Sequence, residues 1–178
     1  HISKDWTWLH SAPMFHLANG SAMYAMVMCA ARHCFIPGFE PEAFLKAVER
    51  YRVTSVLLVP TMMNMVMNHP ALGRHDLSSL RYVTYGASPM PLDLLRRAMD
   101  RLPGAKFRQG YGLSETSPLL TVLQPEDHTF DNLDQRFTPV KSAGRPVVGV
   151  EVRVVALDDN ALPPGQIGEI IARGANIM

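Results

Sequence analysis

The chain has 178 residues, of which 47% are hydrophobic and 19% charged, and its formal net charge is +1. This composition excludes a disordered or low-complexity protein, and the length suffices for a domain that folds without disulfides or a structural metal. A net charge near zero removes the electrostatic reason to expect nucleic acid as a partner. The most apolar stretch, Ala22 to Ala31, has about half the length that a bilayer-spanning helix needs. We therefore expect a soluble, cytoplasmic protein with no transmembrane segment.

Strand and helix patterns alternate through the first two thirds of the chain. We expect strands at 6–12, 33–36, 54–59, 80–85 and 106–109, and helices at 19–31, 41–51, 61–68 and 91–101. The run Thr54 to Val59 is uniformly apolar or β-branched, which is typical of a central parallel strand covered on both faces. This alternation over short connections predicts an α/β fold with a mostly parallel sheet flanked by helices.

The pattern changes after Thr121. Residues 124–143 are polar and lack a strong period, whereas residues 149–156 and 167–173 alternate with the period of two that is typical of antiparallel strands. We therefore divide the chain into an α/β subdomain at 1–123, a connecting segment at 124–143 and the start of an antiparallel β-subdomain at 144–178.

The two cysteines, Cys29 and Cys34, flank His33. Two thiols and one adjacent imidazole supply too few ligands for a closed zinc site. We expect both cysteines to be reduced residues that pack in the interior.

Three clusters at the ends of predicted strands could carry chemistry. The segment 110–116 (GYGLSET) combines two glycines, an aromatic face, a hydroxyl and a carboxylate, which are the parts of a nucleotide and magnesium site. The same spacing could equally start a helix. The turn 85–89 (YGASP) would expose backbone groups to a planar base, or would simply connect a strand to a helix. Met90 stands where a hydrolase nucleophile elbow at Ser88 would need glycine.

The third cluster is 13–16 (PMFH). A lone histidine such as His16 is more often a structural residue than a catalytic one. However, the carboxyl ends of parallel strands meet at one edge of a sheet, so all three clusters are expected to line one crevice.

Six ordered blocks carry a resemblance to a known family. These blocks are PMFH with Gly20, VPT at 59–61, YGASPMP at 85–91, GYGLSET at 110–116, GRP at 144–146 and GQIGEI at 165–170. In this order they resemble the AMP-forming acyl-CoA synthetases of the adenylate-forming superfamily, the fatty-acid and aryl-acid CoA ligases. The resemblance covers essentially the whole chain.

The resemblance implies a role for each matching residue. The side chain of Tyr111 would pack on adenine, with Gly86, Ala87, Ser88 and Gly112 completing the nucleotide pocket. The hydroxyl of Ser114 would contact the phosphates, and the carboxylate of Glu115 would bind magnesium. The side chain of His16 would lie near the carboxylate of the acid, and Gly110 would form part of the acyl-site wall.

The implied substrates and cofactors are a carboxylic acid, ATP, Mg²⁺ and CoA. Magnesium would offset the repulsion between the acid and the triphosphate, which allows attack on the α-phosphate to give acyl-AMP. The CoA thiol would then displace AMP. The acid would be a medium- or long-chain fatty acid or an aryl acid.

The sequence also departs from the family pattern. Ser114 replaces the more usual threonine, and Tyr85 stands where a small residue is common, so that it would narrow part of the pocket. The family's phosphate loop would precede His1, and its ribose-binding aspartate and carboxy-terminal catalytic lysine would follow Met178. We therefore expect an interior fragment of the large domain that carries half of the adenylate site, is inactive alone and self-associates through uncovered apolar surface.

Other functions stay open at this stage. An adenylation domain of peptide synthesis or a non-catalytic binding module would share much of the pattern. A dinucleotide-dependent reductase would need a GxGxxG turn after the first strand, and the chain has none there.

Overall fold

The computed structural model describes residues 2–131 and 138–178, so residues 132–137 of the predicted connecting segment lie outside the described residues. Seven strands form one sheet in the order β2-β1-β3-β4-β5-β6-β7. The first five pair in parallel: β1 (Thr7–His10), β2 (Arg32–Phe35), β3 (Ser55–Leu58), β4 (Tyr82–Gly86) and β5 (Lys106–Tyr111). The predicted mostly parallel sheet is therefore confirmed.

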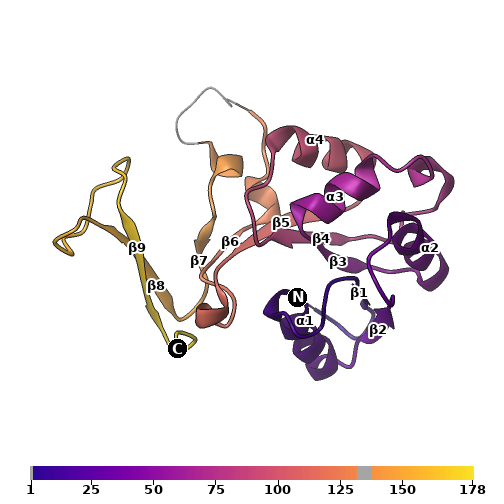
Figure 1. Ribbon diagram of the computed structural model, residues 1–178, viewed down its shortest axis with the longest axis horizontal. Helices are drawn as coiled ribbons and strands as arrows, with labels where there is room; N and C mark the ends of the chain where they lie inside the picture. Colours follow the sequence, from indigo (N-terminus) through magenta and orange to yellow (C-terminus); the bar gives the residue numbers. More distant parts are fainter. Residues whose placement is uncertain (1, 132–137) are drawn as a thin grey trace.

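Two short strands that the sequence pattern did not indicate extend this sheet in antiparallel orientation. They are β6 (Thr121–Leu123) and β7 (Arg145–Pro146). A separate two-stranded antiparallel sheet follows, made of β8 (Val150–Val155) and β9 (Glu169–Gly174), as predicted. It projects from the main body of the molecule (Figure 1).

Four α-helices lie between the strands: α1 (Leu17–Met28), α2 (Pro41–Tyr51), α3 (Pro60–Met67) and α4 (Leu92–Arg101). Helix α2 begins at a proline, whose missing amide costs nothing at that position, and it buries Phe44, Leu45 and Val48. Short 3₁₀ helices occupy Leu72–Arg74, Ser114–Thr116, Pro125–Asp127 and Pro139–Lys141.

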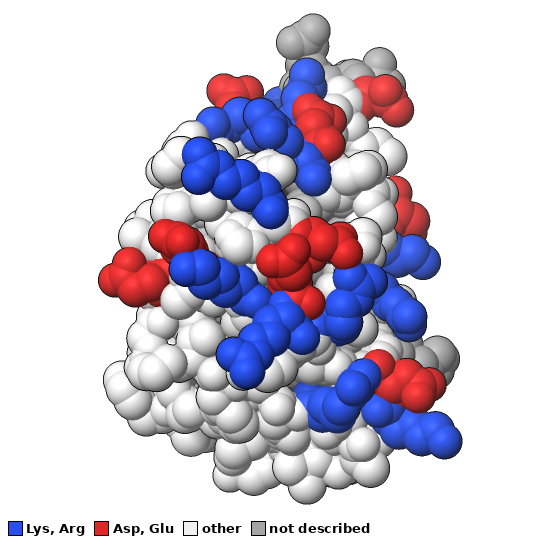
Figure 2. Space-filling view, turned by 90° about the vertical axis from the view of Figure 1, so that its right-hand side faces the viewer, with Lys and Arg blue, Asp and Glu red and all other residues white. Residues whose placement is uncertain are grey.

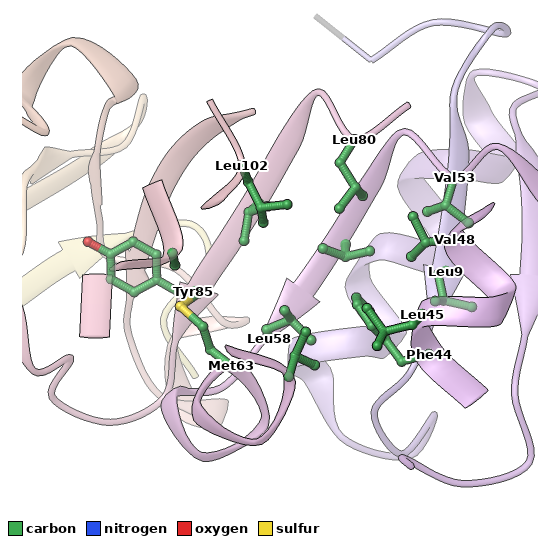
Figure 3. Close-up of a cluster of buried hydrophobic side chains, with 14 of the residues drawn as sticks. Leu9, Phe44, Leu45, Val48, Val53, Leu58, Met63, Leu80, Tyr85 and Leu102 are labelled. Carbon is green, nitrogen blue, oxygen red and sulfur yellow. The ribbon is translucent and has the colours of Figure 1, made fainter. Parts of the chain in front are cut away.

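The helices divide unequally between the two faces of the sheet. Helices α2, α3 and α4 cover one face, and α1 alone lies on the other (Figure 1). The larger hydrophobic cluster includes Phe44, Leu45, Met63 and Tyr85 (Figure 3). The smaller cluster joins Trp6 and Trp8 to Ala22, Met26 and Ala31. Among the described residues, α1 packs mainly on β1 and β2, and it covers the face formed by β3 to β6 less closely.

The surface matches the balanced composition. Figure 2 shows acidic and basic side chains interspersed over the face that it presents. Within residues 2–131 and 138–178, no helix combines the length and apolar character needed to cross a bilayer. Cys29 and Cys34 are both free, and burial raises the pKa of the Cys34 thiol.

Candidate active-site groove

A groove of about 690 Å³ runs between α1 and the sheet. Its volume is in the range of sites for small ligands. Side chains of the sheet floor and of α1 make much of its wall apolar, among them Trp8, Leu57, Ala22, Met26 and Val122. Three of its polar residues, His16, Ser114 and Glu115, follow the carboxyl ends of parallel strands, which is the edge where open α/β sheets bind ligands.

Seven of the predicted site residues line this one groove: His16, Gly86, Ala87, Gly110, Gly112, Ser114 and Glu115. They come from three segments that are separated by many residues along the chain. Ser88 and Tyr111 are not among the lining residues; the former is exposed and the latter half-buried.

Close backbone approach explains why glycine is needed in two of these segments. Gly86 pairs with Gly110 across β4 and β5, and a side chain at Gly86 would collide with the carbonyl of Gly110. A side chain at Gly112 would collide with the carbonyl oxygen of Pro118. The loop after β5 therefore folds back tightly on itself.

Hydrogen bonds fix the loop that carries Ser114 and Glu115. The amide of Leu113 donates to Oγ1 of Thr116 at 2.9 Å, and that hydroxyl donates back to the carbonyl of Leu113. Asn176, which follows β9, donates from Nδ2 to the carbonyls of Thr116 at 2.6 Å and Leu119 at 3.0 Å. Sequence reasoning did not single out Asn176, because its partners lie about 60 residues away.

His16 has a structural contact at the start of α1. Its Nδ1 accepts from the amide of Ala18 at 3.3 Å, which makes it the N-terminal cap of the helix. In the neutral ring the proton then lies on Nε2, which is left to donate to a ligand in the groove.

A buried hydrogen-bond network also fixes the position of α1. His10 lies at the end of β1, and its ring nitrogens contact Oδ1 of Asn19 at 3.0 Å and Nδ1 of His33 at 2.9 Å. The amide nitrogen of Asn19 reaches the carbonyl of Ala12 at 2.7 Å. Burial lowers the pKa of His10, so this network favours the neutral ring.

The Tyr85 ring packs in the larger hydrophobic cluster. It is only 1% exposed and packs beside Met63 (Figure 3). Successive side chains of a strand point to opposite faces, so Thr84 and Gly86 face the groove and the Tyr85 ring does not. Tyr85 is nevertheless among the residues that line the groove, so its narrowing of part of the pocket stays a prediction.

The groove has the donor set that a phosphate-bound magnesium ion needs. In the part of the chain that the structure describes, no three His, Cys, Asp or Glu side chains converge as a complete metal cage. Magnesium in nucleotide sites is usually held by one or two carboxylates together with substrate phosphates and water. The exposed carboxylate of Glu115, beside the hydroxyl of Ser114, fits that requirement.

Comparisons with known proteins agree with this geometry. The family model described as AMP-binding enzyme matches residues 1–178. Feruloyl-CoA synthase from Amycolatopsis sp is 36% identical over 99% of the chain and 34% of its own length. Indoleacetate–CoA ligase from Aromatoleum aromaticum is 33% identical over 99% of the chain and 33% of its own length. The chain thus spans about a third of the curated relatives it matches.

Two solved structures extend the comparison. The amide bond synthetase McbA from Marinactinospora thermotolerans matches with a TM-score of 0.86 and 30% identity, over 100% of this chain and 34% of that one. The O-succinylbenzoate coenzyme A synthetase MenE from Bacillus subtilis, in complex with ATP and magnesium ion, matches with a TM-score of 0.82 and 26% identity. That match covers 99% of this chain and 34% of the MenE chain.

Proposed function

The chain belongs to the family of AMP-binding enzymes, and on that premise we propose that the protein containing it is an acid–CoA ligase. It would join a carboxylic acid to AMP and then transfer the acyl group to CoA. The observation that carries this proposal is the single groove in which three strand-end segments meet an apolar floor.

The chemistry divides between the two ends of the groove. The acid would lie along the apolar floor, with Gly110 against it and its carboxylate near Nε2–H of His16. ATP would lie at the strand ends, with adenine against Tyr111 and the segment Gly86, Ala87 and Ser88. The hydroxyl of Ser114 would donate to the phosphates.

The first step forms a bond between a carboxylate oxygen and the α-phosphorus and breaks the bond to pyrophosphate, which leaves. In the second step the CoA sulfur attacks the acyl carbon, AMP leaves with the carboxylate oxygen, and the thiol proton passes to solvent. A magnesium ion bound by Glu115 would neutralise charge on the phosphates. The protein's own contribution is to hold both reactants in attacking geometry.

We propose an aryl acid as the substrate, because two relatives act on aromatic acids by name and the floor is lined by Trp8 and Leu57. A medium- or long-chain fatty acid would also suit the apolar wall.

Amide formation is the second candidate function, favoured by the likeness to an amide bond synthetase. It shares the acyl-AMP step and replaces CoA by an amine, so a comparison of CoA and amine as acceptors distinguishes the two functions.

The cytoplasm, which keeps free thiols such as Cys29 and Cys34 reduced, is the proposed location.

The test is exchange of labelled pyrophosphate into ATP by the full-length protein, with and without acid. Glu115→Gln should lower acid-dependent exchange at least 100-fold, because a neutral amide binds magnesium poorly. Glu169→Gln, an exposed change on β9, serves as the matched control and should keep wild-type exchange. Normal exchange by Glu115→Gln would refute the magnesium role. The 178-residue chain by itself should show no turnover and only weak ATP binding in calorimetry.

A further inference from the structure

Arg108 places a positive charge in the groove, whose wall is largely apolar. It lies on β5 two residues before Gly110, and both residues line the groove. The alternation of side chains along a strand puts Arg108 on the same face as Gly110 and about 6–7 Å deeper than that glycine.

The protein supplies a side-chain hydrogen-bond acceptor to only one nitrogen of the Arg108 guanidinium. Its Nε donates to Oγ1 of Thr84 at 3.1 Å, and its central carbon lies 5.3 Å from the centroid of the Tyr82 ring. Among residues 2–131 and 138–178, no ion pair and no second side-chain hydrogen bond involves Arg108. The four N–H donors on its two terminal nitrogens therefore lack a protein acceptor in this part of the chain.

Partial burial of the guanidinium with unpaired N–H donors costs free energy unless a ligand supplies acceptor oxygens. Arg108 is half-buried, and desolvation lowers its pKa, although an arginine stays charged at physiological pH. A half-buried charge without a counter-ion is destabilising, whereas an acceptor oxygen from a ligand would offset the cost. The Thr84 contact and the Tyr82 ring, itself stacked on Trp6 at 4.7 Å, fix the direction of the side chain.

We propose that Arg108 selects acids that carry an oxygen acceptor at the end remote from the reacting carboxylate. The substrate class is an aryl acid with an ether, phenolic or carboxylate oxygen on the far side of the ring, held by the terminal nitrogens of Arg108. This inference rests on the proposed ligase function and deepens it, since it concerns the specificity of the same groove.

The experiment uses the full-length protein and three probes: 3-phenylpropenoic acid and its para-methoxy and para-carboxy derivatives. Wild-type kcat/KM in pyrophosphate exchange should favour the para-substituted acids by about 10- to 100-fold, the factor expected for a hydrogen bond to a charged group. Arg108→Met should reduce this preference to less than about threefold. Thr84→Val, which removes only the acceptor of Nε, should reduce it partially, and exposed Arg50→Met on α2 should leave it unchanged.

A preference that survives Arg108→Met would overturn the proposal, as would an equal loss for all three acids. Quenching of the fluorescence of Trp8, which lines the groove, gives a second readout through acid binding alone. If no acid supports exchange by the wild type, the ligase function fails. A loss of selective binding on Arg108→Met would still support the role of Arg108 in that case.

Discussion

Tyr85 and His128 form a buried hydrogen bond. The Tyr85 hydroxyl lies 3.0 Å from Nε2 of His128, while Nδ1 of His128 lies 2.8 Å from the carbonyl of Gln124. The carbonyl can only accept, so Nδ1 carries the proton and Nε2 accepts from the hydroxyl. Burial lowers the pKa of His128, although the bond to the Gln124 carbonyl opposes this shift, and acceptance by Nε2 from the Tyr85 hydroxyl requires the neutral ring.

This geometry predicts the sign of a pH effect on stability. Below the ordinary histidine pKa of about 6.5 the unfolded chain binds a proton that folded His128 resists, so the free energy of unfolding should fall from pH 7 to pH 5.5. His10, whose pKa is also lowered by burial, contributes in the same direction. Urea denaturation at the two pH values measures the difference, and His128→Gln should reduce it.

The variant Tyr85→Phe distinguishes the effect of His128 titration on stability from the effect of the Tyr85–His128 hydrogen bond. It keeps His128 but leaves its Nε2 without a donor, so the free energy of unfolding should fall by about 1–3 kcal/mol at both pH values. The pH difference itself should persist in this variant. A pH-independent stability in the wild-type protein would contradict the assignment of neutral buried rings.

Residue identity alone could not fix side-chain direction. The sequence placed His16 and Glu115 at strand ends, where the groove contains both. It did not single out Arg108, and it did not show that the Tyr85 ring packs in the larger hydrophobic cluster. Side chains alternate between the two faces of a strand. Counting back from Gly86 and Gly110 in steps of two puts Arg108 on the face of the groove and Tyr85 on the opposite face.

At the scale of elements, the loop between β5 and β6 is the part whose shape the groove depends on. It turns tightly enough for Gly112 to meet the carbonyl of Pro118, and it presents Ser114 and Glu115. Strand β6 then returns antiparallel beside β5. Three residues of β6 and two of β7 are too few to show a periodic pattern, which is why the sequence predicted neither strand.

Gly112→Ala should therefore displace this loop. A misplacement of about 1 Å at a reacting centre can lower turnover about 100-fold, and we expect a loss of at least 10-fold in acid-dependent exchange. Gly104→Ala is the matched control, because a side chain there meets nothing within 4 Å. Equal activity of the two variants would show that the loop tolerates movement.

The apolar side chains that remain uncovered on the molecule include two groups on regular elements. One lies on α1 and β2, where Tyr24, Val27, Met28 and Phe35 are between 56% and 86% exposed. The other is the sheet of β8 and β9, where Ile170 and Ile171 are exposed. Isolated two-stranded sheets are marginally stable and need a partner layer.

We therefore expect the 178-residue chain to self-associate at high concentration. Light scattering over a concentration series measures this, and Val27→Lys with Met28→Lys should reduce the apparent mass. A monomer throughout the series would show that these surfaces do not drive association.

The α/β alternation was strong enough to predict the five parallel strands and the four helices. Their boundaries differ by a few residues, as at α1, which begins at Leu17 rather than Asn19. The shape of the groove could not be predicted from the sequence, since it depends on how α1 packs on the sheet, mainly against β1 and β2.

In the proposed reaction a carboxylate oxygen attacks the α-phosphorus of ATP, and isotope transfer follows that oxygen. The full-length protein is incubated with an aryl acid that carries ¹⁸O at both carboxylate oxygens, together with ATP, magnesium and CoA. The masses of the products are then measured by mass spectrometry. We predict one ¹⁸O atom in each AMP released and none in pyrophosphate. Unlabelled AMP, or label in inorganic phosphate, would rule out attack of the carboxylate on the α-phosphorus.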